Sequence, residues 1–282
     1  MQTAEAPRRV KVIRPPSFSP LRLAANLRDL AGYGDLLYTL SLHRIHVRYK
    51  QSLLGLAWAI LQPLSLALVY TVIFRIVTRM PSNGLPYPVF AYCALLPWTF
   101  FSTSLTNSSS GMIGHTQLIT KVYFPREIIP LTYVIAGLAD LAIASTVLAG
   151  MMAFYGIKPT WQALYLIPIL LVAVLFTAAL ALIFSAVQVR FRDIGLALPL
   201  LLQLWMFASP VVYPLSAVPR WLRGWYELNP LAGVVEGFRR VLLEGKPPDF
   251  PSLEIAAAIS VVLLPLCYLF FKNREATMAD II

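Results

Sequence analysis

Long stretches without a formal charge constrain this chain more than any other feature of its sequence. The longest runs from Met80 to Thr120 and holds 41 residues, and the stretch from Pro159 to Val189 holds 31. Three further stretches, 51–74, 194–219 and 255–271, hold 24, 26 and 17 residues. A bilayer core about 30 Å thick needs about 20 helical residues. We therefore expect a polytopic membrane protein.

The expected fold is all-α, because a backbone in lipid must satisfy its polar groups internally. We expect six transmembrane helices, at about 53–74, 89–112, 128–155, 161–188, 194–213 and 255–271. Five of them fall in the charge-free stretches, and the third carries a single charge. Only 13% of the residues are charged, against about 25% in soluble domains. The chain then divides into an N-terminal region (1–52), a membrane domain (53–271) and a short tail (272–282).

Basic residues predict the orientation of these helices. Of the 23 Lys and Arg residues, 15 fall in the four segments 1–52, 113–127, 189–193 and 272–282. Basic loops stay in the cytoplasm, so we expect both termini on that side. The net charge of +10 is spread over several loops rather than one face, which argues against a nucleic-acid partner.

The residues before the first span predict an amphipathic helix that lies along the inner membrane surface. Asp35 follows two helix-breaking glycines and can cap this helix. The helix would set apolar side chains against polar ones: Leu36, Leu37, Leu40 and Val47 against His43, Arg44 and His46. Arg44, Arg48 and Lys50 would anchor it, because the anionic inner leaflet attracts basic side chains.

Neither a metal site nor a disulfide is expected. His43 and His46 stand at i and i+3, but no third metal ligand lies nearby in the sequence. Cys93 and Cys267 both fall in apolar stretches, which is typical of buried cysteines that act as small apolar side chains.

Five stretches carry a family resemblance. The first begins the first span and contains Tyr49, Lys50, Ser52, Gly55, Trp58 and Pro63. The others follow in order: KVYFPREIIPL (121–131), VRFRDIG (189–195), SPVVYP (209–214) and NPLAGVVEGFRR (229–240). Together they resemble the type-2 ABC export permeases, especially exporters of lipid-linked polysaccharide. The resemblance extends over nearly the whole chain.

The resemblance implies a homodimeric permease in the bacterial inner membrane, among membrane lipids, with two copies of a separate ABC ATPase. Its substrate would be undecaprenyl-linked polysaccharide of the O-antigen type, and ATP and Mg²⁺ would bind only the ATPase. The sequence agrees, because it contains no GxxxxGK[ST] phosphate loop, and we expect no catalytic residues. Alternatives within the family are a capsule or teichoic acid exporter and a drug or small-lipid exporter. Outside it stand an enzyme acting on polyprenyl phosphates and a membrane scaffold.

A short inner loop is the expected contact with the ATPase. The resemblance implies that it forms a coupling helix, and its candidate residues are Lys121, Tyr123, Phe124, Pro125, Arg126 and Glu127. The alternative is a basic anchor with an interfacial aromatic residue. Arg190, Arg192 and Asp193 form a second inner loop, which could couple to the ATPase or only fix the topology.

Aromatic and polar residues of the second and fifth spans are candidates for the pore lining, since sugar rings stack on aromatic side chains. The candidates are Trp98, Phe100, Phe101, Asn107, Trp205, Phe207 and Tyr213. The alternative for the aromatic residues is contact with lipid or the membrane interface.

Asp140 stands near the middle of the third span, where a charge is costly, so it must face protein or water. We favour an interhelical hydrogen bond, with Gly137 allowing close approach. A polar role in the pore or in a proton relay is the alternative.

Residues 214–244 are expected to enter the outer leaflet and return, narrowing the external mouth of the pore. Asn229 and Pro230 form a helix start. The helix that follows is too short and too polar to span a bilayer. Candidate gate residues are Asn229, Pro230, Glu236, Phe238, Arg239 and Arg240, with ion pairs expected from Arg240 to Glu236 and Glu244. The alternative is an amphipathic helix lying flat on the outer surface.

Overall fold

The computed structural model describes residues 30, 32–50, 57–77, 82 and 84–281. All regular secondary structure in these residues is helical, as expected. The α-helices are α2 (Gly34–Lys50), α3 (Ala57–Tyr70), α4 (Tyr87–Gly114), α5 (Thr116–Lys121), α6 (Ile128–Phe154), α7 (Leu166–Arg190), α8 (Ile194–Phe207), α9 (Arg220–Glu227), α10 (Pro230–Leu242) and α11 (Phe250–Ile281). The π-helix η2 (Thr71–Val77) continues α3, and the 3₁₀-helices η3 (Trp161–Tyr165) and η4 (Leu215–Ala217) precede α7 and α9.

Four of these helices are long and apolar enough to cross a membrane: α4, α6, α7 with η3, and α11. They correspond to the second, third, fourth and sixth expected spans. The other two expected spans coincide with shorter apolar helices, Ile60–Arg75 and Ile194–Phe207. The membrane class is therefore confirmed, whereas the number of six spans stays a prediction.

α4 is the central helix of the bundle. It packs against α3, α6, α7 and α10, and 78% of the residues in its most apolar stretch are buried. The corresponding share is only 28% in α6 and in α11. A helix that is buried around its whole circumference forms a core, whereas helices with one buried face form the periphery. The faces of α6 and α11 that turn away from α4 are left for lipid or for another chain.

Two glycines let α4 and α6 approach closely. A Cβ atom added at Gly137 of α6 would overlap Ser104 Oγ and come within 3.2 Å of the Phe100 ring. A Cβ atom at Gly111 of α4 would overlap the Tyr133 ring. Small residues at helix crossings bring backbones together, and packing is the main source of helix association in lipid. The expected role of Gly137 is thus confirmed.

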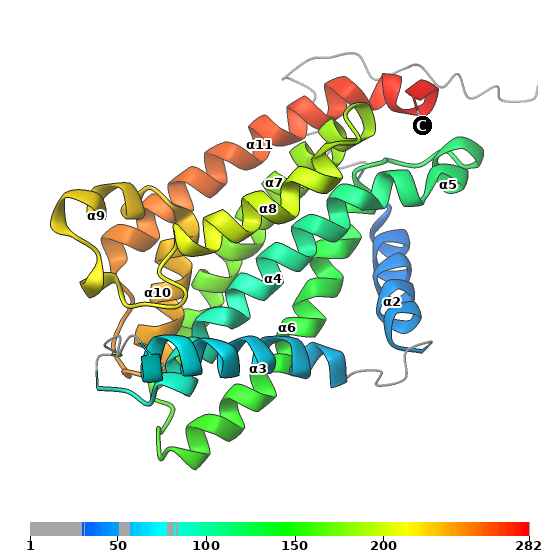
Figure 1. Cartoon of the computed structure of the whole chain (residues 1–282). Coiled ribbons are helices and arrows are strands. Elements are labelled where there is room, and N and C mark those ends of the chain that lie inside the picture. The colour runs from blue at the N-terminus through cyan, green and yellow to red at the C-terminus, as the bar shows by residue number, and fades with distance from the viewer. Residues whose placement is uncertain (1–29, 31, 51–56, 78–81, 83, 282) are drawn as a thin grey trace, which may run out of the picture.

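The two ends of the bundle carry different elements. α5 and the C-terminal end of α11 lie at one end, and α9 and α10 lie toward the other (Figure 1). α2 packs against α6 on the side that carries α5. α10 ends as the sequence predicts, because Gly245 adopts a positive φ of 63° just after the helix and two prolines follow.

We expect Gly137→Ala to weaken the α4–α6 packing by about 1–3 kcal/mol, the usual cost of overpacking. Gly150→Ala is the matched control, because Gly150 also lies in α6 but has no atom within 4 Å of an added Cβ. Thermal unfolding of the purified chain in detergent measures both variants. Equal melting temperatures for the two would contradict the proposed close contact.

Candidate functional site

The inner loop joins α5 to α6 and presents two opposite sets of side chains. Tyr123 is 67% exposed and Val122 is 52% exposed, and Lys121 beside them is also exposed. Phe124, by contrast, is only 5% exposed and packs into a cluster with Ile119 and other apolar residues of α4, α6, α7 and α11. The surface available to a partner is therefore Lys121, Val122 and Tyr123.

Glu127, directly before α6, is buried in a polar cluster with α11. Lys272 Nζ donates to Glu127 Oε2 at 2.8 Å, and Tyr268 Oη donates to Oε1 at 3.0 Å. Lys272 also pairs with Glu275 at 2.9 Å. Burial raises the pKa of the Glu127 carboxyl, and the nearby ammonium of Lys272 opposes this shift. At the start of α6 the carboxylate is further favoured by the helix dipole.

Arg126 fastens the same loop to α11. Its backbone N–H donates to Glu275 Oε1 at 3.0 Å, and its guanidinium donates to the Glu275 carbonyl. Two of the expected contact residues, Phe124 and Glu127, thus face the protein interior rather than a partner. A partner cannot reach a buried ring or a buried ion pair from outside. The contacts of these two side chains inside the chain hold the shape of the loop instead. Pro125 and Arg126 are half-buried beside them.

Arg44 also differs from its expected role as a membrane anchor. It faces α6, where its guanidinium carbon lies 3.6 Å from the centre of the Tyr133 ring. Its Nε donates to Thr132 Oγ1 at 2.5 Å. The helix turns this arginine inward because Leu36, Leu37 and Leu40 pack on the same apolar cluster, which brings the next turn against α6. Lys50 remains exposed.

The remaining residues of the first-span stretch lie partly outside the described structure. Ser52 and Gly55 fall outside the described residues, and Arg48 and Tyr49 lie in the last turn of α2. Trp58 is 52% exposed on α3. Pro63 is buried within α3, where it lines a small crevice that also contains Asp140.

A polar cavity of about 370 Å³ lies between α2, α4 and α6. Its lining includes His43, Arg44, Thr103, Ser104, Asn107, His115, Tyr133 and Asp140. Asp140 thus faces a polar space between helices, as its cost in lipid requires. Asn107, a candidate for the pore lining, opens onto this same cavity. The structure leaves both expected roles of Asp140 open.

His115 at the mouth of this cavity has one defined tautomer. Its Nδ1 lies 2.8 Å from the Gly111 carbonyl, which can only accept a hydrogen bond, so Nδ1 carries the proton. Nε2 is then free to accept from Arg44 Nη1 at 3.5 Å. Burial lowers the pKa of His115, and the charge of Arg44 adds to this effect. Arg44 therefore lies beside a His115 ring whose protonated form is disfavoured.

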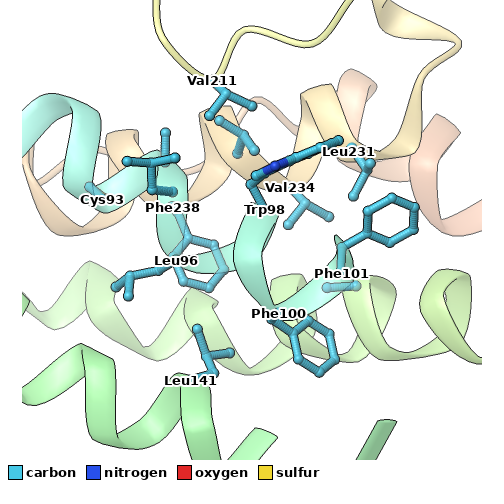
Figure 2. Close-up of a cluster of buried hydrophobic side chains, with 14 of the residues drawn as sticks. Cys93, Leu96, Trp98, Phe100, Phe101, Leu141, Val211, Leu231, Val234 and Phe238 are labelled. Atoms are coloured by element: carbon cyan, nitrogen blue, oxygen red, sulfur yellow. The ribbon is translucent and has the colours of Figure 1, made fainter. Parts of the chain in front are cut away.

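Three of the proposed pore aromatics lie in the packed core instead. Trp98, Phe100 and Phe101 are at most 5% exposed, and Figure 2 shows them among apolar side chains of neighbouring elements. Phe101 stacks on Phe176 of α7, with ring centres 5.8 Å apart. In the structure of the single chain these three rings therefore fill the core between helices, and they face neither a pore nor lipid there.

The other aromatic candidates lie around α8. Trp205 is half-buried against Phe101, at 5.4 Å between ring centres. Phe207 is 45% exposed at the end of α8. The Tyr213 hydroxyl lies 2.6 Å from the Tyr226 hydroxyl and donates to the Phe207 carbonyl at 2.5 Å. Of the proposed pore rings, Phe207 is thus the most accessible from outside the chain.

The side chain of Asn229 connects α8 to α10 through hydrogen bonds. Its side-chain oxygen accepts the Leu231 N–H at 3.2 Å, which confirms it as the N-cap of α10. The same oxygen accepts Trp205 Nε1–H at 3.2 Å, while its amide nitrogen donates to Ser209 Oγ at 2.8 Å. One amide therefore fixes both the start of α10 and its position against α8.

Arg239 of α10 is the largest fully buried side chain among the described residues, and it is only 2% exposed. Its guanidinium donates to the carbonyls of Pro210 at 2.5 Å, Tyr213 at 3.2 Å, and Val211. Its Nε donates to the Phe90 carbonyl at 3.4 Å, and its guanidinium carbon lies 3.7 Å from the Phe90 ring centre. Arg239 thus holds the turn after α8 against the beginning of α4.

The charges of α10 pair differently from the expected i, i+4 pattern. Glu236 lies 3.8 Å from Arg239, and Arg240 lies 3.8 Å from Asp249. The register explains the difference, because Arg239 turns inward with Phe238 and draws Glu236 toward it. The apolar face of α10 is buried against α4, α7 and α11, and its buried residues include Leu231, Val234, Val235, Phe238 and Val241.

The comparisons with known proteins agree along most of the chain. The ABC-2 type transporter family matches residues 36–243. The O-antigen export system permease protein RfbA of Myxococcus xanthus is 34% identical over 258 residues, covering 90% of this chain and 98% of that protein. A protein of the same name from Klebsiella pneumoniae is 32% identical, over 75% of this chain and 81% of its own length. The polysialic acid transport protein KpsM of Escherichia coli is 27% identical, over 85% and 93% respectively.

We expect Lys272→Met to loosen the inner loop, because it leaves the buried carboxylate of Glu127 without its cation, at a cost of about 3 kcal/mol. Hydrogen exchange of the amides at 122–131 should accelerate. Adding Glu127→Gln to this variant should restore part of the protection, because the uncompensated charge is gone. Purely additive effects of the two substitutions would show that the pair is not coupled.

We expect Arg239→Met to destabilise the chain by about 3 kcal/mol, because several buried carbonyls lose their donor. Arg240→Met is the control: this neighbour is partly exposed, its one ion pair is 3.8 Å long, and such pairs are worth at most about 1 kcal/mol. Thermal unfolding in detergent compares them. A larger loss of stability in Arg240→Met than in Arg239→Met would contradict this role of Arg239.

Proposed function

Because the chain belongs to the ABC-2 type transporter family, we propose that it is the membrane subunit of an ATP-driven polysaccharide exporter. Its substrate in this proposal is undecaprenyl-linked polysaccharide of the O-antigen type. The supporting observation is the similarity to an O-antigen export permease over 98% of that protein's length. The membrane is the bacterial inner membrane, with both termini in the cytoplasm.

The energy source in this proposal is a separate ABC ATPase, since the sequence contains no phosphate-binding loop. The ATPase binds ATP and Mg²⁺ and docks on the exposed surface formed by Lys121, Val122 and Tyr123. The contacts from Glu127 to Lys272 and from Arg126 to Glu275 support this role. They connect the loop to α11, so a movement of the docked ATPase would be transmitted through the loop to this long helix.

The functional unit in this proposal is a homodimer with two ATPase subunits. α3 and α8 support it, because each exposes a row of large apolar side chains that no other described residue covers. On α3 these include Trp58, Leu61, Leu64 and Leu68, and on α8 they include Leu196, Leu200, Leu204 and Phe207. We assign these faces to the pore-forming contact between two copies, with α3 and α8 as the first and fifth of six spans.

The segment 214–244 forms the outer constriction in this proposal. α10 is too short to cross a membrane, yet it packs among α4, α7 and α11. This packing favours a re-entrant segment over a helix lying flat on the outer surface. Trp221 and Trp225 of α9 are exposed, and tryptophans prefer the membrane interface. α2 lies along the opposite, cytoplasmic surface.

A capsule exporter is the second candidate, because the polysialic acid transport protein is 27% identical over 85% of this chain. A strain that lacks this chain distinguishes the two. We expect lipid-linked glycan to accumulate inside the cell, and mass spectrometry of the extracted lipid identifies the sugars. Normal surface polysaccharide with no accumulated precursor would refute export of either kind.

We expect Tyr123→Asp to abolish both export and co-purification of the ATPase, because it places a charge on the exposed docking surface. The matched control is Tyr155→Asp, which changes an exposed tyrosine after the far end of α6 and should retain the ATPase. Phe124→Asp should instead lower the melting temperature of the chain, since it buries a charge. If Tyr123→Asp retains the ATPase, the loop only anchors the chain.

A further inference from the structure

A cleft of about 270 Å³ lies between the C-terminal end of α7 and the last turns of α11. Its polar side is formed by Arg190, Arg274 and Thr277. Its other side is apolar and is lined by Ala186, Val187, Val189, Phe191, Phe270 and Met278. This cleft is separate from the inner loop, from the polar cavity beside α2 and from the uncovered faces of α3 and α8.

The charged side chains that line the cleft are both positive. Arg190 and Arg274 are both exposed, and none of the described residues that line the cleft is acidic. Each guanidinium lies beside a phenylalanine, 5.6 Å from the Phe191 ring centre and 5.7 Å from that of Phe270. Within the part of the chain that the structure describes, neither arginine has an acidic partner within ion-pair distance.

The nearest acidic side chain on α11 is already engaged. Glu275 binds Lys272 and the backbone of Arg126, so it does not neutralise the neighbouring Arg274. Asp193 is exposed in the loop after α7 and does not line the cleft. Two arginines therefore remain available for an anion from outside the chain.

The position of the cleft identifies the kind of anion. α7 and α11 are two of the four helices long enough to span a membrane, and the arginines lie at their ends. The apolar wall continues from the arginines along both helices. A ligand with a negative phosphate at one end and a hydrocarbon chain at the other matches this arrangement, and basic pockets between membrane helices bind lipid headgroups in this way.

We propose that the cleft between α7 and α11 binds an anionic phospholipid of the surrounding bilayer. The phosphate contacts Arg190 and Arg274, and an acyl chain lies along the apolar wall. The bound lipid covers the last turns of α11, whose Lys272 and Glu275 hold the inner loop. The orientation under the proposed function places this site at the cytoplasmic leaflet, whereas the site itself is independent of the exported substrate.

The test is native mass spectrometry of the purified full chain titrated with phosphatidylglycerol or phosphatidylcholine. We expect retention of phosphatidylglycerol only. Each arginine near a lipid surface contributes about 1 kcal/mol, which corresponds to about a fivefold change in affinity. Arg190→Gln/Arg274→Gln should therefore weaken retention about 25-fold, and Arg190→Lys/Arg274→Lys should keep most of it.

Arg192→Gln is the matched control, because Arg192 is exposed in the same loop but does not line the cleft. It should retain phosphatidylglycerol like the unaltered chain. Equal retention by the double glutamine variant overturns the proposal, as does equal retention of phosphatidylcholine. Displacement by inorganic phosphate alone would reveal a free-anion site, and binding of only a polyprenyl diphosphate would assign the cleft to the substrate. Either result also overturns it.

Discussion

The whole arrangement depends on the burial of α4 by its neighbours. Glycines at the crossing with α6 bring the two backbones together, and α7, α10 and α3 cover most of the remaining surface of α4. In a membrane the contacts between helices come from packing rather than from expulsion of water. A helix with close neighbours on every side can therefore serve as the core, even where its residues are as polar as Ser104, Ser108 and Ser109.

Buried polar residues connect the functional ends to this core. Ser108 donates to the Pro130 carbonyl at 2.9 Å, and Ser109 pairs with Gln188 of α7. At the end that carries α5, Glu127 and Lys272 join α6 to α11. Each group would be costly to leave unpaired in a medium of low dielectric constant. The partners of these groups therefore fix the helix positions more narrowly than apolar contacts alone.

The sequence was informative where a local signal existed. The near absence of charge over long stretches predicted the four long helices, and Asn229 with Pro230 marked the start of α10. The direction in which a side chain points was harder to predict, since the inner loop has the same charged and aromatic residues whether Phe124 faces a partner or the core. Likewise, Lys272 lies 145 residues from Glu127, and Arg239 lies 149 residues from Phe90. Such partners follow from tertiary packing, which the charge and hydropathy pattern of a single sequence does not contain.

The contacts of Arg239 have a mechanical consequence. The turn at 210–213, the first part of α4 and α10 share one guanidinium, so none of them can shift alone without breaking at least one hydrogen bond in a buried environment. If the proposed export path widens at this end to pass a sugar chain, these three elements must therefore tilt together as one rigid unit.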